Sequence, residues 1–296
     1  AADLAVSEFS LLTHGRVNSA GLFVLSSRAS IDMSIKGGSK FAAWFGLRFQ
    51  SDDLESYFAA AATPVPLDPA APDPIVDLYI LAFSRGLALN TAAISLENLG
   101  GTPLELTFFA GRLDRFCTGD DFPVLFGAAP FSTSMRGFMV YPEGIGGDTS
   151  RSYDGLHSVF GTGIRMGLSG GSVVPYLYLY QDLWLGPGIY SSDARVLINT
   201  DKVKLEAFVG ASFPQSVAGL YRGGLLFYYD TGSIGDFYAQ VGLPRWDPSS
   251  PFSAELLYFL FEPRIHFGFG SLTLSLFFRP SWYLFVPTGD QGALDM

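Results

Sequence analysis

Histidine, serine and carboxylate side chains are the first places to look for chemistry in this chain of 296 residues. His157 is followed directly by Ser158, but no G-x-S-x-G elbow surrounds the pair, so a nucleophilic serine is not indicated. Glu262, Arg264 and His266 alternate along one segment, which places an acid, a base and an imidazole on one face of a strand. This grouping fits an ion-pair cluster better than a metal site. We therefore predict no catalytic residue, no cofactor and no metal, and expect that the chain is not an enzyme.

Composition and the single cysteine narrow the class of protein. Cys117 is the only cysteine, which excludes an internal disulfide and a cysteine metal cluster. The chain is 48% hydrophobic and only 16% charged, against about 25% charged for a typical soluble domain. No segment supplies the roughly 18 clean apolar residues that a membrane helix needs, so a closed β-barrel is the other way to span a bilayer. The net charge of −10 argues against a nucleic-acid partner.

Strands are the elements that must position these side chains. Over residues 23–35 the odd positions are mainly apolar and the even positions mainly polar or charged, and residues 41–49 repeat the pattern after a Gly-Gly turn. A strict period of two predicts a hairpin with one apolar and one polar face. Each arm runs beyond the usual strand length and reaches the length of a transmembrane β-strand. A hairpin of a soluble sandwich alternates equally well, so recurrence must decide between the two.

The pattern recurs along the chain, and the connections between strands alternate in length. Tight turns are expected at residues 36–40, 98–102, 169–172, 199–202, 230–234 and 270–271. Wider links are expected at residues 15–19, 52–73, 114–155, 185–187, 214–217 and 244–252. Residues 74–98 are interpreted as one strand with a bulge, or else as a separate short hairpin. The layout predicts an all-β fold: a transmembrane antiparallel up-and-down β-barrel of about 12–14 strands, with tight turns on one side and longer loops on the other.

In this architecture the chain resembles a Gram-negative outer-membrane β-barrel protein of the porin-like class. The resemblance covers nearly the whole chain, residues 1–296, as a single barrel domain, but it rests on no signature motif, so no functional residues are carried over. It implies an outer-membrane location, with residues 1–3 as a mature end left after removal of a signal peptide. Residues 287–296 depart from the class, because a polar tail replaces the usual final aromatic residue. The count of 13 strands also departs from the usual even number, so either one strand is miscounted or a closing strand comes from elsewhere.

Charged side chains on the polar faces are expected to line a lumen. They are Arg28, Asp32, Arg48, Glu105, Arg165, Arg195, Glu206, Arg222, Glu262, Arg264 and Arg279. Because this set leans basic, we predict a channel that passes small solutes through a mildly basic lumen, with some anion preference. Barrels of this size lie between filled and open ones, so the alternative is a non-conducting structural or scaffolding subunit of an outer-membrane assembly. The expected partners are membrane lipid, small solutes and possible protein partners or further copies of the chain, but no nucleic acid.

The longest interruption of the strand pattern is residues 114–155, rich in glycine, proline, aspartate and serine. Residues 131–141 within it could form a strand of their own, so the segment is either a single long loop or a loop that carries a strand. Loops this long tend to be functional. The segment is predicted either to fold over or into the mouth of the barrel and narrow it, or to lie as a loop on the surface. In the first case the constriction would carry Arg115, Asp120, Asp121, Arg136 and Arg151.

Overall fold

The computed structural model describes residues 2–17, 21, 23–37, 40–51, 87–134, 155–183, 185, 188–213 and 219–278. Its strands are β1 (Ala2–Val17), β2 (Phe23–Gly37), β3 (Phe41–Ser51), β4 (Leu87–Leu96), β5 (Leu104–Phe116), β6 (His157–Leu168), β7 (Val173–Asp182), β8 (Tyr190–Asn199), β9 (Val203–Phe213), β10 (Leu220–Asp230), β11 (Gly235–Trp246), β12 (Tyr258–Phe267), β13 (Gly270–Thr273) and β14 (Leu276–Phe278). The described residues also include the helix α3 (Asp121–Phe126) and the 3-10 turns η1 (Leu99–Gly101), η2 (Gly232–Ile234) and η3 (Ala254–Leu256). Among the described residues, no helix has the length and apolar character needed to cross a membrane.

The strands form one long antiparallel up-and-down sheet. From β1 to β13 each strand pairs with the next one along the chain, and β14 pairs with β12. The all-β, up-and-down fold class predicted from the sequence is thereby confirmed. Of the ambiguous segment 74–98, residues 87–96 form β4, and residues 74–86 lie outside the described part of the chain.

The two faces of the sheet differ sharply in chemistry. Large apolar side chains stand exposed on one face, with Phe108 51% and Val209 64% accessible. Alternate positions on the same strands carry buried polar groups, such as Asp193 and Glu206, both 0% accessible. This is the period-two pattern of the sequence realised in space, because successive residues of a strand point to opposite faces.

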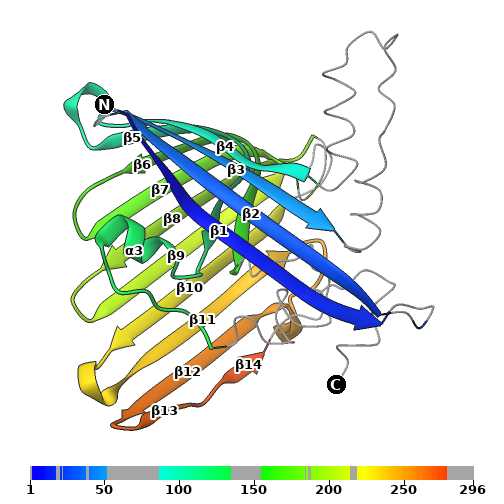
Figure 1. Ribbon diagram of the computed structural model, residues 1–296, viewed down its shortest axis with the longest axis vertical. Helices are drawn as coiled ribbons and strands as arrows, with labels where there is room; N and C mark the ends of the chain where they lie inside the picture. The colour runs from blue at the N-terminus through cyan, green and yellow to red at the C-terminus, as the bar shows by residue number, and fades with distance from the viewer. Residues whose placement is uncertain are drawn as a thin grey trace.

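The sheet curls around an interior. Figure 1 shows β1–β3 crossing in front of the middle strands, with α3 beside β8 and β9. The face with the buried polar groups is the one that α3 contacts, so it is the inner face. The apolar face is therefore the outer one.

One turn prediction was wrong. The turn expected at residues 270–271 lies at residues 268–269, and Gly270 begins β13. Phe269 is 95% exposed in that turn. It continues the apolar alternation of Ile265 and Phe267, so the sequence pattern placed the end of the strand two residues too late. Of residues 131–141, which the sequence allows to form a strand, residues 131–134 are not in one, and Phe131 packs on the inner face; residues 135–141 lie outside the described part.

Candidate functional site

Residues 117–134, here called the inner segment, are fastened to the inner face of the sheet at their start. The backbone N–H of Cys117 donates to Glu206 Oε1 of β9 at 2.6 Å. Gln240 of β11 donates through Nε2 to the carbonyl oxygen of Cys117. Asp121, in the first turn of α3, pairs with Arg195 of β8 at 2.5 Å. Strands β8, β9 and β11 therefore all bind the first residues of the inner segment, between Cys117 and Asp121.

The end of the inner segment is fastened to β10 and β12. The backbone N–H of Ser134 donates to Glu262 Oε2 at 3.1 Å, and Arg264 donates to the carbonyl oxygen of Ser132. Phe131 stacks on Tyr228 of β10 with ring centroids 4.3 Å apart. The segment is thus held at both ends, and its aromatic residues fill the space between them.

The fold of the inner segment follows from its sequence. Asp121 supplies a negative charge to the first turn of α3, where the helix dipole favours one. Gly127 ends the helix in the left-handed conformation, with φ 65°, and its N–H caps the last turn. Phe122 is fully buried and packs against Phe131 at a centroid distance of 5.4 Å. Because Asp121 directly precedes Phe122 in the chain, this apolar contact helps to orient the Asp121 side chain toward β8.

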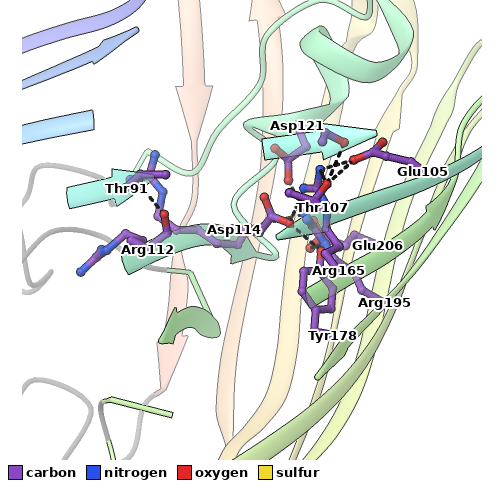
Figure 2. A network of polar contacts seen from close by, with 12 residues as sticks. Thr91, Glu105, Thr107, Arg112, Asp114, Asp121, Arg165, Tyr178, Arg195 and Glu206 are labelled. Atoms are coloured by element: carbon purple, nitrogen blue, oxygen red, sulfur yellow. Dashed lines mark hydrogen bonds and ion pairs between the residues drawn. The ribbon is translucent and has the colours of Figure 1, made fainter. Parts of the chain in front are cut away.

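A polar network on the inner face begins at Arg165 of β6 (Figure 2). Its guanidinium contacts Glu105 at 2.5 Å and Asp114 at 2.9 Å, both from β5. The Tyr178 hydroxyl donates to Asp114 at 2.6 Å, and Thr107 donates to Glu105 at 2.8 Å. Every carboxylate in this group therefore has an arginine and a hydroxyl as partners.

Arg195 forms the centre of a second group, next to the first (Figure 2). Its Nε donates to Glu206 Oε1 at 2.8 Å, and its Nη2 pairs with Asp121. The guanidinium also lies over the ring of Phe116, 4.8 Å from the centroid, a favourable cation–π placement. Burial raises the pKa of Asp121 above its ordinary value, although Arg195 acts in the opposite direction.

A third group surrounds Asp193 of β8, toward the end of the sheet where the longer connections lie. Arg222 of β10 contacts both carboxylate oxygens, with Nε at 2.6 Å and Nη2 at 2.9 Å. The Tyr180 hydroxyl donates to Asp193 at 2.8 Å, and His157 Nε2 lies 3.3 Å from it. The partners of His157 are thus a tyrosine and an aspartate, while the Oγ of Ser158 makes no hydrogen bond within the described residues.

The structure brings together seven of the predicted lumen residues on the inner face, each of them in an ion pair. They are Glu105, Arg165, Arg195, Glu206, Arg222, Glu262 and Arg264. Arg28, Asp32 and Arg48 occupy positions in β2 and β3, and the first two alternate with the exposed Ile31 and Ile35. Arg279 lies outside the described residues.

The predicted constriction residues do not all lie in one loop. Arg115 belongs to the end of β5 instead of a loop and pairs with Asp120 at 3.3 Å. The predicted loop boundary at residue 114 was therefore early, because β5 continues to Phe116 opposite His157 of β6. Asp121 pairs with Arg195 of β8 on the inner face. Arg136 and Arg151 lie outside the described residues.

Sequence reasoning missed several partners of these charges. Tyr178 and Gln240 occupy alternate strand positions of the polar face, and that period was the available signal. Asp114 carried no such signal, because it stood inside the predicted loop. Within the described residues no group of three or more histidine, cysteine, aspartate or glutamate side chains is arranged to hold a metal ion.

No protein-family model and no curated protein matches the sequence. Among solved structures, a mutant of Rh. blastica porin is 14% identical, with 95% of this chain and 86% of that chain covered and a TM-score of 0.48. Salmonella typhi OmpF, in complex with daunomycin, is 9% identical over 94% of this chain and 89% of that chain, with a TM-score of 0.39. The trimer form of Vibrio cholerae OmpT is 9% identical over 94% and 89%, with a TM-score of 0.34. By structure, this chain is similar over nearly its full length to bacterial porins.

Proposed function

We propose that the chain is a single outer-membrane β-barrel domain that passes small solutes, with the inner segment as its constriction. The observation that carries the proposal is the opposition of the two faces. Exposed apolar side chains such as Phe108 and Val209 suit contact with lipid acyl chains, while the paired charges around Arg165, Arg195 and Arg222 lie on the inner face. The proposed location is the outer membrane of a Gram-negative-type bacterium, and the proposed role is non-enzymatic.

The conducting path runs beside the inner segment. On the side of β8–β12 the space is closed, because Phe116, Phe122 and Tyr238 are completely buried there. We therefore place the path between the inner segment and β1–β4, where the predicted lumen residues Arg28 and Arg48 occupy strand positions. We expect the residues of β1–β4 to determine which solutes pass.

Ion selectivity is expected to be weak. The sequence predicts a mildly basic lumen from a count of side chains, but Arg165, Arg195, Arg222 and Arg264 each contact at least one carboxylate. A paired arginine adds little net field for a passing anion. Any anion preference then depends on basic residues such as Arg48.

Planar-bilayer recording of the detergent-purified chain tests the proposal. Discrete conductance steps are expected, with a small reversal potential in a salt gradient. Arg48→Glu should shift that potential toward cation selectivity, because it reverses a charge that the sequence predicts to line the lumen. Lys202→Glu, the same charge change in an exposed turn, serves as the matched control and should shift it less.

A second function, a non-conducting structural barrel, is favoured by the packed interior. Phe131 stacked on Tyr228 and the paired ends of the inner segment are what a plug would need. The same recordings separate the two functions. A chain that inserts and folds but gives no conductance steps would support the scaffold and contradict the channel.

A further inference from the structure

Two arginines on the inner face are each shared by two carboxylates (Figure 2). Arg165 contacts Glu105 and Asp114, and Arg195 contacts Asp121 and Glu206. If every group were ionised, four negative charges would face two positive ones. Buried charges without compensation are costly, so such a cluster must be balanced by further donors or by protons.

The Arg165 group is balanced by hydroxyl donors. Thr107 donates to Glu105, and Tyr178 donates to Asp114 at 2.6 Å. Hydrogen bonds to the charged form of a carboxylate favour that form. Both carboxylates of this group can therefore remain ionised.

The Arg195 group has a different arrangement. Arg195 Nε and the Cys117 N–H both donate to the same oxygen of Glu206, Oε1, at 2.8 and 2.6 Å. Glu206 Oε2 is buried and has no hydrogen-bond partner among the described residues. Glu262 is equally buried, yet both of its oxygens accept: Oε2 from the Ser134 N–H and Oε1 from Ser275 Oγ at 2.8 Å. Among the described residues, Asp236 Oδ1 is the other buried carboxylate oxygen without a hydrogen bond, but Arg264 Nη1 lies 3.5 Å from it, whereas no cation is paired with Glu206 Oε2.

Among the described residues, the groups around Glu206 include one cation, Arg195. Arg195 faces it from β8, Asp121 from α3 and the Cys117 thiol from the inner segment, with Asp114 and Tyr178 beyond the arginine. Asp121 and Glu206 therefore compete for one guanidinium. Burial disfavours the charged form of both carboxyl groups, but the side chain of Asp121 is 32% exposed and that of Glu206 is 0% exposed, so water stabilises the charge on Asp121 more than that on Glu206.

We propose that Glu206 binds a proton on Oε2 at neutral pH, and that this neutral carboxyl fastens the inner segment to β9 through the Cys117 N–H. Oε1 then acts as the carbonyl-type acceptor for its two donors, and Asp121 forms the single ion pair with Arg195. Alkaline pH removes the proton and places a second negative charge beside Asp121. Like charges repel in a medium of low dielectric constant, so the attachment of the inner segment weakens. The inference does not depend on whether the barrel conducts.

Infrared spectroscopy tests the proposal directly. At neutral pH the folded chain should show the C=O stretch of a buried carboxylic acid, and ¹³C-labelled glutamate should shift it. Glu206→Gln, which has the shape of the protonated side chain, should abolish the band. Asp120→Asn is the matched control, because it removes the neighbouring carboxylate that pairs with Arg115, and it should leave the band unchanged.

Attachment of the inner segment is measured by thiol labelling of Cys117. As the pH rises, labelling of the unchanged chain should accelerate when the infrared band disappears, and it should be faster than in Glu206→Gln at the same pH. Absence of any acid band that shifts with labelled glutamate would overturn the proposal, and so would a band that survives Glu206→Gln. The first result needs no variant, so it decides even if Glu206→Gln fails to fold.

Discussion

At the scale of single residues, Cys117 is expected to be chemically inert at neutral pH. Its side chain is fully buried, and burial raises the pKa of the thiol well above its ordinary value. The thiolate is the reactive form, so both access and ionisation are suppressed. Iodoacetamide should leave the folded chain unmodified at neutral pH and modify it after unfolding, as mass spectrometry would show. Rapid modification of the folded chain would mean that the inner segment is not packed on β9.

Residue partners were the least predictable part of the site. The parity of strand positions placed Arg195 and Glu206 on the polar face, and the structure pairs them across β8 and β9. Nothing in the sequence indicated that Asp121, from a separate segment, would take the other side of the same arginine. Such a contact depends on how the inner segment folds back, and alternation carries no information about that.

At the scale of elements, the approach of β6 to β7 depends on glycine. Gly163 pairs with Tyr180, and a Cβ at this position would overlap the carbonyl oxygen of Leu179 and the Cβ of Tyr180. Gly163→Ala should therefore destabilise the fold by about 1–3 kcal/mol, the usual range for overpacking. Urea unfolding in detergent would measure it.

The matched control for that substitution is Gly268→Ala. Gly268 lies in the turn before β13, and a Cβ there would meet nothing within 4 Å. Its effect should stay within about 0.5 kcal/mol, as for most surface changes. Equal losses at both positions would contradict close packing of β6 on β7.

Elements were predictable where the period of two is regular and unpredictable where it is not. Residues 203–212 alternate strictly, and they form β9 with the expected faces. Residues 131–134 carry an aromatic and small polar residues that suit a strand, but Phe131 is held by Tyr228 and Phe122 instead of by a ladder. Tertiary packing therefore overrode local preference in the inner segment.

At the scale of the whole molecule, the fold class followed from recurrence. One alternating hairpin fits a sandwich as well as a barrel, whereas tight turns alternating with long links over the whole chain fit an up-and-down sheet. The sheet of the described residues has fourteen strands against the thirteen counted from the sequence, because the last predicted strand is divided into β13 and β14. The sequence could not predict which residues pack inside the sheet. That depends on where the inner segment, residues 117–134, lies, and this segment has no strand pattern.

The apolar outer face makes a prediction that concerns the molecule and its solvent together. Val209 stands 64% exposed near the middle of β9, and a hydrocarbon environment at this depth would reject a charge. Val209→Arg should cost about 2–4 kcal/mol of stability in lipid vesicles, the range for arginine near the midplane of a bilayer.

Ile234→Arg is the matched control. Ile234 is 70% exposed, but it lies in the tight turn η2 at the strand ends, where the expected cost is about 0–1 kcal/mol. Urea titration of both variants in vesicles measures the difference. Equal and small effects would mean that water, and not lipid, covers the middle of the outer face, and the membrane function would then be wrong.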